Sequence, residues 1–397
     1  MTSHLSWSAA RDEAHRQGSL LTGAPVTLDL VASLGRTLAA DVRAPGAVPA
    51  HDGAAMDGWA VAGAPPWRLG AAIVAGAAPS TRTLEPGHAR PVTTGAPVPP
   101  GTTSVVRSED AHVDDTGRLV QDTVSTRRHI RPAGEEVTLG DLLVRAGSVL
   151  TPPRAALAAA SGVDRVSLAP APTVRVAVLG DEIVGAGVPQ PGQVRDVFTH
   201  TLPGILRSFG ADPVGAVRVP DDRAATTAAL AGTGARLVVT TGGTAGSSTD
   251  HVRGALDAIG AQLLLDRVEV RPGRPMLLAR RDDTLYLCLP GNPMAAMVGA
   301  VLLGEPLVAG LLGRPPAPTS TVRLAVDVPN DRPGALVLAY VLDDHPDGDD
   351  RDHRAVPANR QTSAMLRGLA DADGLMVVPT GGASAGDVVP TLRLPWS

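Results

Sequence analysis

Three carboxylates, Glu182, Asp221 and Asp250, follow apolar runs that end in glycine or proline turns. If these runs form parallel strands of one sheet, their carboxyl ends meet at the edge where such sheets bind ligands. A magnesium ion bound to a phosphorylated ligand needs only one or two protein carboxylates, which these residues could supply. The alternative is that the acids cap the helices that follow, a role that Asp often takes. It stays open for Asp221, whereas the glycine turns before Glu182 and Asp250 favour binding.

A loop of glycine and hydroxyl residues, 240–248, could bind the phosphate of such a ligand. Backbone N–H groups around Gly242 and Gly243, with the N-terminus of the next helix, can surround an anion. The loop lacks the Gly-Lys-Ser/Thr ending of a P-loop, and glycine loops are often only tight turns. Arg271 and Arg274, on the rigid turn 271–275, could neutralise the same anion through bidentate contacts. The alternative is a surface turn with two solvated arginines.

Several other polar residues lie in short turns. In the segment 289–293, Asn292 and Pro293 suit the cap and the first position of a helix. That structural account is sufficient, and it also directs the positive end of the helix toward the ligand edge. Asp57 and Thr94 each lie in a glycine-containing turn, and the local sequence indicates only turn residues there. The histidines and the single cysteine show no metal-ligand spacing, and there is no serine-nucleophile elbow.

The composition indicates a soluble protein with more than one domain. A chain of 397 residues is too long for one compact core and suggests two to four domains. The net charge of -5 gives no global attraction to nucleic acid or to acidic membranes. There is no lysine, so every cationic role falls to arginine. The single cysteine, Cys288, excludes an intramolecular disulfide and is typical of a reducing compartment.

No membrane segment is expected. Residues 1–17 carry polar and acidic side chains and contain no apolar signal core. The segment 294–312 is strongly apolar, but Glu305 and Pro306 interrupt it, which favours a packed helix over a membrane span. We therefore expect a cytoplasmic protein.

The pattern of apolar residues predicts helices and strands in three separate groups. Residues 5–40 indicate two short helices, because Leu28, Leu30, Val31, Leu34 and Leu38 have helical spacing. The Pro-, Gly- and Thr-rich stretch that follows predicts short strands at 59–61, 73–74, 104–107 and 118–120, and then a helix at 153–160. Alternation then predicts strands at 174–179, 214–219, 236–241 and 284–289. Helices are expected at 197–209, 223–231, 250–259 and 294–312.

These elements predict a multidomain α/β and β protein. Strands separated by helices indicate a doubly wound parallel sheet over residues 172–314. A β insert at 44–145 interrupts an N-terminal helical and linker domain made of 1–43 and 146–171. After a Pro-rich linker at 313–319, residues 320–397 predict a small C-terminal β domain with one helix near 363–370. The acidic tract 343–352 is expected to be a solvated loop.

The order of these motifs along the whole chain resembles the molybdopterin molybdenumtransferase family. The matching pieces include Leu38-Ala39, Ala55 to Val61, Thr94 to Pro97, Arg131 to Glu136, Gly180-Asp181-Glu182, Pro220-Asp221-Asp222, Gly242-Gly243 with Asp250, Arg271 to Pro275, Leu289 to Pro293, and Ser363 to Leu366. The resemblance implies that the doubly wound domain binds molybdopterin. It also implies insertion of molybdate into adenylylated molybdopterin, with a divalent cation, Mg²⁺, and release of AMP and molybdenum cofactor.

The resemblance also implies roles for individual residues. Glu182 and Asp250 would hold the metal and orient the phosphoanhydride. The residues that would line the site are Asp57, Thr94, Glu136 and Asp221. Arg267 and Arg271, where the family usually has lysines, would hold molybdate or phosphate. Pro290, Pro293 and Ser363 would shape the pterin and oxyanion pockets. A homodimer is implied, with a cleft completed by the partner, and an adenylyltransferase and molybdoenzymes are candidate partners.

The chain departs from the family pattern around the expected pterin loop. Val178-Leu179 stands where the family has Ser-Thr, and Phe198 stands where it has Asn. The loop 244–249 loses a glutamate and gains hydroxyls. Two alternatives therefore remain: a diverged paralogue that carries pterin without catalysis, and a molybdopterin adenylyltransferase. The insert and the terminal domain argue against the second, since that enzyme consists essentially of the α/β module alone.

Overall fold

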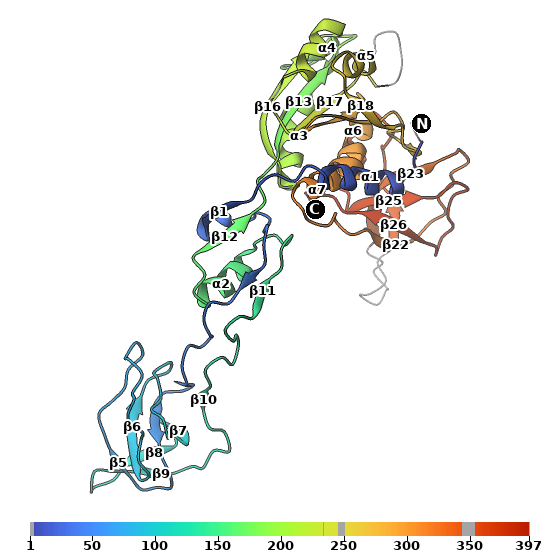
Figure 1. Cartoon of the computed structure of the whole chain (residues 1–397). Helices are drawn as coiled ribbons and strands as arrows, with labels where there is room; N and C mark the ends of the chain where they lie inside the picture. The colour runs from blue at the N-terminus through green and yellow to red at the C-terminus, as the bar shows by residue number, and fades with distance from the viewer. Residues whose placement is uncertain (1–3, 233, 245–250, 344–353, 397) are drawn as a thin grey trace.

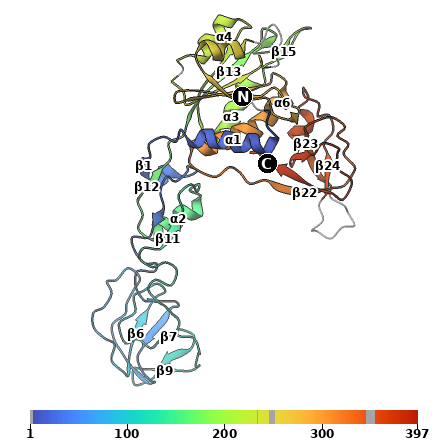
Figure 2. The same ribbon diagram turned by 45° about the vertical axis from the view of Figure 1, so that its right-hand side comes forward.

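The computed structural model describes residues 4–232, 234–244, 251–343 and 354–396. The chain is elongated (Figure 1), with a central α/β unit and a C-terminal β domain at one end and the β insert at the other. A narrow linker region connects them. Turned by 45°, the same arrangement shows helix α1 lying across the central unit (Figure 2).

The central sheet contains six strands in the order β16-β13-β17-β21-β20-β18. Four of these are parallel and match the prediction: β16 (Asp212–Val219), β13 (Thr173–Leu179), β17 (Leu237–Thr241) and β21 (Thr284–Leu289). The other two, β20 (Leu277–Arg281) and β18 (Gln262–Asp266), are antiparallel and were not predicted. The segment 267–276, which contains no helix, follows β18, and β20 turns directly into β21, so neither gave a βαβ pattern. A register shift also interrupts the pairing of β18 with β20.

Helices cover both faces of this sheet, which confirms the doubly wound fold. The helices of the central unit are α3 (Phe198–Ser208), α4 (Arg223–Leu230), α5 (Val252–Ala258), α6 (Pro293–Gly299) and α7 (Glu305–Leu311). Along β13, Val176 and Val178 belong to the core shared with α3 and α7, whereas Ala177 and Leu179 belong to the core shared with α4 and α5. Both faces are therefore dry, and burial raises the pKa of the Cys288 thiol in β21 to about 11.

The apolar segment near residue 300 forms one continuous core helix, as predicted. Helices α6 and α7 are joined by a π-helical turn at Ala300–Gly304. Pro306 has no N–H to donate one turn back to Leu302, and the wider turn accommodates that loss. Pro293–Leu311 is long and apolar enough to span a membrane, but this length is buried inside the protein. Its apolar character is explained by core packing.

Helix α1 (Trp7–Ser19) packs closely against α7. A Cβ on Gly18 would lie 2.2 Å from the Leu307 carbonyl oxygen, and one on Gly310 would lie 2.2 Å from that of His15. Both positions therefore require glycine. The contact places α1 with the central unit, while the segment that follows it runs into the linker region (Figure 1).

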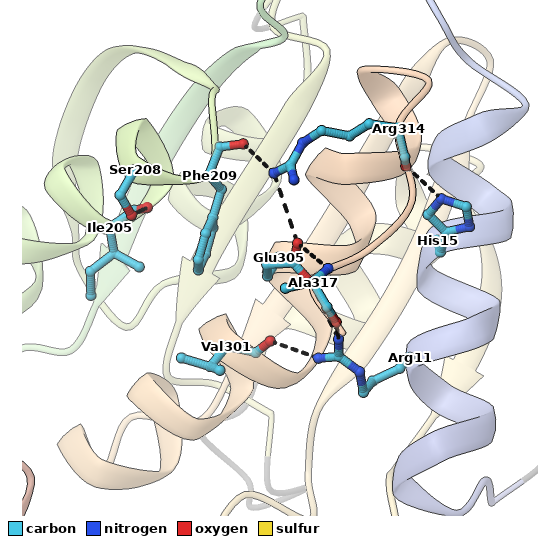
Figure 3. A network of polar contacts seen from close by, with 9 residues as sticks. All are labelled: Arg11, His15, Ile205, Ser208, Phe209, Val301, Glu305, Arg314 and Ala317. Atoms are coloured by element: carbon cyan, nitrogen blue, oxygen red, sulfur yellow. Dashed lines mark hydrogen bonds and ion pairs between the residues drawn. The ribbon is translucent and has the colours of Figure 1, made fainter. Parts of the chain in front are cut away.

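A buried polar network fastens α1 to the central unit (Figure 3). Glu305, at the start of α7, lies 3.4 Å from Arg11 Nη2 and 3.8 Å from Arg314 Nη2. Its Oε1 accepts a hydrogen bond from the Ala317 amide at 2.9 Å, and Arg11 donates to the Val301 and Ala317 carbonyls. One carboxylate therefore connects α1, α7 and the linker that leads to the C-terminal domain.

The second predicted helix in residues 5–40 is wrong. Residues Val26–Asp29 form strand β1, antiparallel to β12 (Arg165–Leu168), and only Val31–Ser33 make a 3-10 turn. The leucines had helical spacing, but Leu28 and Leu30 pack beside Leu38 and Val166 in the linker core. The strand partner lies about 140 residues away along the chain, and such tertiary pairing overrides local spacing.

The linker region and the insert consist of short strands. The linker contains β2 (Val42–Arg43) paired with β11 (Leu142–Val144), followed by α2 (Pro152–Ala160), close to the predicted helix. The six strands of the insert sheet are β7 (Ser104–Arg107), β4 (Gly58–Val61), β6 (His88–Val92), β5 (Trp67–Leu69), β9 (Arg118–Gln121) and β8 (Ala111–Val113). The strand predicted at 73–74 is only a bridge between Ile73 and Val92. Between linker and insert, β3 (Gly53–Ala54) pairs with β10 (Ile130–Arg131).

The C-terminal domain is a small barrel. Strand β25 pairs with both β26 and β23, so five strands close on themselves. They are β22 (Ser320–Leu324), β23 (Ala335–Asp343), β24 (Arg354–Pro357), β25 (Gly374–Val378) and β26 (Val388–Leu392). The helix predicted at 363–370 is shorter: α8 spans only Arg367–Ala370. Residues before it form turns, because the Ser363 carbonyl accepts from Ala295 of α6 at 3.2 Å and not from its own helix.

Candidate functional site

A cavity of about 570 Å³ lies at the carboxyl edge of the central sheet. Strands β13, β16, β17 and β21 all end at it, as expected for ligand sites in doubly wound sheets. The short pair β14 (Ile183–Val184) and β15 (Val194–Arg195) forms one wall, and Ala364 of the C-terminal domain reaches another. Seven of the residues singled out from the sequence line this one cavity: Glu182, Asp221, Gly242, Gly243, Pro290, Asn292 and Pro293.

Glycines let the backbone approach closely at the cavity. Gly242 has a φ of +87°, and a Cβ there would lie 2.8 Å from the Leu179 carbonyl oxygen. A Cβ on Gly243, with a φ of +66°, would lie 2.8 Å from Val252 of α5. Both positions therefore need glycine to place β17 against its neighbours. The Gly242 N–H donates to the Leu289 carbonyl at 3.0 Å, which ties the turn to β21. Residues 245–248 of the predicted phosphate loop lie outside the described residues.

Two adjacent acids before α4, Asp221 and Asp222, differ in what they contact. Asp222 is the cap of α4, because its Oδ1 accepts from the Ala225 amide at 2.7 Å. Asp221 is free of that role and lines the cavity. The Asp221 amide donates to Asp181 Oδ1 at 3.2 Å, and the Asp181 amide donates back to Asp221 Oδ2 at 3.4 Å. This exchange fixes the ends of β13 and β16 to each other and sets Asp221 beside the Gly180 turn.

Glu182 and Asp221 have the donor chemistry that magnesium prefers. The Glu182 carboxylate folds over Gly180, where a Cβ would lie 2.5 Å from its Oε2. Within the described residues, no three His, Cys, Asp or Glu side chains could hold a metal by themselves. Two carboxylates with open ligand positions suit Mg²⁺, which takes its remaining oxygens from phosphate and water. Asp250, the other predicted metal ligand, lies outside the described residues.

Asp196 lines the cavity, and its carboxylate binds the start of α3. Its carboxylate accepts from the Phe198 and Thr199 amides at 3.0 and 2.9 Å and from the Thr199 hydroxyl at 2.6 Å. Burial alone would raise the pKa of Asp196, but these hydrogen bonds outweigh it and lower the pKa below its ordinary value. Asp196 therefore positions α3, a role the sequence analysis missed, although an Asp two residues before a helix is a recognisable cap signal.

One wall of the cavity is apolar. The apolar lining comes from Leu179, Ile183, Val194, Val197 and Phe198, with Arg195 and Asp196 in the same stretch of chain. Leu179 and Phe198 are the two substitutions noted in the sequence, where family members carry polar residues. The cavity thus offers carboxylates, suited to a cation, and apolar side chains, suited to an uncharged planar ring.

The predicted arginines do not line the cavity. Arg271 lies in β19 (Val270–Arg271), which pairs with β23, and its guanidinium donates to Asn330 Oδ1. Asn330 in turn donates to the Gly334 and Pro379 carbonyls. Arg271 therefore fastens the barrel to the central sheet and does not line this cavity, and its expected role in holding molybdate or phosphate stays a prediction. Arg267 lies near Asp266, and Arg274 is exposed. Only Pro275 of the turn reaches the cavity.

Ser363 contacts the site through Asn292. Asn292 precedes α6 as predicted, but its side chain makes no cap hydrogen bond. Its Nδ2 instead donates to Ser363 Oγ at 3.3 Å. The amide thus joins the start of α6 to the C-terminal domain and fixes the neighbouring Ala364 at the cavity.

Asp57, Thr94 and Glu136 lie away from the cavity of their own chain. Asp57 and Thr94 flank strands β4 and β6 in the insert, at the far end of the molecule (Figure 1). Asp57 Oδ1 accepts from the Thr94 amide at 2.6 Å and from its hydroxyl at 2.8 Å. Glu136 is exposed in the strand-like segment that leads back to the linker. The structure brings Asp57 and Thr94 together, and separates both from Glu182.

The contact between Asp57 and Thr94 predicts a measurable pKa change. Hydrogen bonds from the Thr94 amide and hydroxyl lower the pKa of Asp57. A lowered pKa means that the contact stabilises the fold above the unfolded value of about 3.9 and is lost as pH falls through the folded value. We expect Thr94→Val to raise the Asp57 pKa, and Thr94→Ser to restore it, in an NMR titration of the carboxyl carbon. The pKa of Asp114, which has a similar bond from Thr116, should not move. An Asp57 pKa unchanged by Thr94→Val would contradict this account.

Comparisons with known proteins give the same result along the whole chain. Residues 5–162 match the MoeA N-terminal region (domain I and II), residues 175–310 match a probable molybdopterin binding domain, and residues 321–394 match the MoeA C-terminal region (domain IV). The chain is 32% identical over 376 residues to molybdopterin molybdenumtransferase 2 of Mycobacterium tuberculosis, covering 89% of this chain and 91% of that protein. It is 28% identical over 393 residues to the molybdopterin molybdenumtransferase of Bacillus subtilis, covering 92% and 90%.

The fold is also that of a solved structure. The molybdopterin biosynthesis MoeA protein from Pyrococcus horikoshii OT3 has a TM-score of 0.79, with 19% sequence identity, and covers 98% of this chain and 100% of that one. At this identity the likeness concerns the fold alone. It includes the insert and the C-terminal domain, which a single α/β module lacks.

Proposed function

The chain belongs to the molybdopterin molybdenumtransferase family, a group of transferases in molybdenum cofactor biosynthesis, and from this premise we propose how its residues act. The substrates are adenylylated molybdopterin and molybdate, and the products are molybdenum cofactor and AMP. The observation that carries the proposal is the meeting of Glu182, Asp221 and the Gly242-Gly243 turn at one cavity. Acids for a cation and backbone donors for phosphate there match a phosphoanhydride.

The carboxylates and the apolar side chains of the cavity each have a role in this proposal. Glu182 and Asp221, with Asp250, hold Mg²⁺, which when bound supplies positive charge that stabilises the phosphoanhydride as it is cleaved. The N–H of Gly243 orients a phosphate oxygen, since that of Gly242 already donates to the Leu289 carbonyl. The apolar wall at Ile183 and Phe198 holds a heterocycle of the substrate and excludes water. Cleavage adds water across the phosphoanhydride, releasing AMP and leaving the pterin phosphate.

We also propose a homodimer in which the partner completes the site. The support is the distance of Asp57 and Thr94 from the cavity of their own chain, since an elongated molecule can present its insert to a second copy (Figure 1). The protein is proposed to act in the cytoplasm, where a free thiol such as Cys288 stays reduced.

Mixing two inactive variants tests the dimer. Glu182→Gln disables the cavity and Asp57→Asn disables the insert residue that would serve the partner's cavity. If sites are shared, dimers that contain one copy of each variant have one intact site. Equal mixing should then restore about a quarter of the wild-type rate, after exchange of subunits, with each variant alone as control. No recovery, although exchange is shown by mass, would refute the shared site.

One assay tests the reaction itself. Purified protein receives adenylylated molybdopterin, magnesium and molybdate, and the release of AMP is followed together with cofactor formation. AMP release that depends on molybdate and magnesium supports the transferase. Tight pterin binding without AMP would favour a carrier, and pyrophosphate formed from ATP and molybdopterin would favour an adenylyltransferase.

A further inference from the structure

The C-terminal barrel carries a second hollow, outside the cavity described above. It has a volume of about 600 Å³ and lies between β23, β24 and α8. Its floor is apolar and includes Val341, Val356 and Pro357, and its rim carries Arg360, Arg367 and Asp371. We call this hollow the barrel groove. An apolar floor with a few charged groups on the rim is typical of a small-molecule site.

Two arginines of the groove have no internal partner. Both Arg360 and Arg367 are exposed and line the groove. Among the described residues neither guanidinium makes an ion pair or a hydrogen bond, although Asp371 lies on the same rim. Two guanidinium groups that share one hollow can bind a phosphate through paired N–H donors. With one carboxylate opposite them, the rim keeps a net positive charge.

The backbone that carries Arg360 is held rigidly. Arg360 has a φ of +55°, a conformation that non-glycine residues rarely adopt. The Gln361 side chain accepts from the Ala339 amide at 2.7 Å and donates to the Ala358 carbonyl at 2.5 Å. Gly368 donates to the Arg360 carbonyl at 3.3 Å, and a Cβ on Gly368 would lie 2.3 Å from the Asn359 oxygen. A site fixed in this way loses little entropy when a ligand binds.

The same segment reaches the catalytic cavity. The two ends of the segment 359–367 line the barrel groove through Arg360 and Arg367. Ala364, in the middle of the same segment, lines the cavity at the sheet edge. The Ser363 hydroxyl accepts a hydrogen bond from Asn292 Nδ2 at 3.3 Å, and the Ser363 carbonyl accepts one from the Ala295 amide at 3.2 Å. A ligand that fixes Arg360 and Arg367 therefore acts on a segment shared by both hollows.

We propose that the barrel groove binds a nucleoside monophosphate and that its occupancy changes ligand affinity at the catalytic cavity. Arg360 and Arg367 hold the phosphate, the apolar floor contacts the base, and Asp371 accepts a hydrogen bond from a hydroxyl or amino group. The choice of AMP as the probe rests on the proposed function, which releases it. The groove chemistry does not depend on turnover.

Binding of AMP to the Glu182→Gln protein tests the site without catalysis. Calorimetry measures AMP affinity in three proteins: Glu182→Gln alone, Glu182→Gln with both Arg360→Ala and Arg367→Ala, and Glu182→Gln with Arg332→Ala as a matched control. Arg332 is an exposed arginine that does not line the groove. The pair should weaken AMP binding by about tenfold or more, whereas Arg332→Ala should leave it within about twofold. In the Glu182→Gln protein, adenosine should bind more weakly than AMP. In the protein that also carries Arg360→Ala and Arg367→Ala, AMP should bind as weakly as adenosine.

The coupling is tested by pterin affinity with and without AMP. In the Glu182→Gln protein, AMP should change the dissociation constant of molybdopterin. Adding Arg360→Ala and Arg367→Ala should abolish that change. If replacing Arg360 and Arg367 leaves AMP affinity unchanged, or if adenosine binds the Glu182→Gln protein as tightly as AMP does, the proposed site is refuted. Binding of a glutamate-rich peptide but not of AMP would also overturn it, in favour of a protein partner. An absence of AMP release by the wild type would refute the proposed function and leave these binding results unaffected.

Discussion

Replacing Glu182 by glutamine is expected to reduce AMP release by about a hundredfold or more, while molybdopterin still binds. Glutamine has nearly the same shape, so the Gly180 turn and the apolar wall are preserved. What is lost is one of the two described negative charges at the cavity that can hold a cation against the phosphoanhydride. The rate is measured as AMP formed per enzyme under saturating substrate, and pterin binding by its fluorescence.

The matched control for this substitution is Glu85→Gln, an exposed glutamate of the insert that is not among the cavity residues. It removes the same charge from the protein and should leave the rate unchanged. A second readout is the magnesium concentration at half-maximal rate, which should rise in Glu182→Gln and stay constant in Glu85→Gln. Normal turnover of Glu182→Gln would show that the metal assignment is wrong.

The central fold could be predicted because its signals are local and strong. Strand β21 was predicted with its observed bounds, and β13 to within one residue, because a continuous apolar run buried on both faces is a clear pattern. Strands β18 and β20 were missed for the opposite reason. β18 is the edge strand and β20 lies between it and β21, and both pairings are antiparallel, so neither strand is followed by the helix that marks a parallel unit.

The site could be predicted only in part. Topology brings Glu182, Asp221 and Gly242 together whenever the strands are parallel, so their meeting follows from the sequence pattern. The direction of a side chain does not follow from it. Arg271 looked like an anion ligand, but pairing of β19 with the barrel turns it toward Asn330. Asp222 and Asp221 are neighbours with equal propensity to cap, and only the helix start of α4 decides between them.

In the proposed function, the substitutions at Leu179 and Phe198 change the apolar lining of the cavity and not its carboxylates. Both residues line the cavity together with other apolar side chains. A ring bound there would meet a leucine and a phenylalanine in place of a hydroxyl and an amide, while Glu182 and Asp221 would remain for a cation. The chain would therefore select its ring by shape more than by hydrogen bonds, which weakens discrimination between similar rings.

Replacing Glu305 by alanine is expected to lower the free energy of unfolding by about 3 kcal/mol. The Glu305 side chain is only 9% exposed and serves Arg11, Arg314 and the Ala317 amide. Burial lowers the pKa of Arg11, and the nearby Glu305 charge acts against that shift. Without Glu305, the buried guanidinium of Arg11 and the half-buried one of Arg314 lose their shared counter-charge, so the contact between α1 and α7 weakens. The measurement is urea unfolding of the whole chain, with cleavage in the 313–319 linker as a local probe.

Two further variants separate charge from packing in this network. Glu305→Gln keeps one acceptor for the Ala317 amide and should cost about half as much. Glu135→Gln breaks the exposed ion pair with Arg131, 2.9 Å apart, and should cost less than about 1 kcal/mol. If Glu305→Ala were as mild as Glu135→Gln, the network would not hold α1 in place. The close approach of Gly18 and Gly310 alone would then account for the position of that helix against the central sheet.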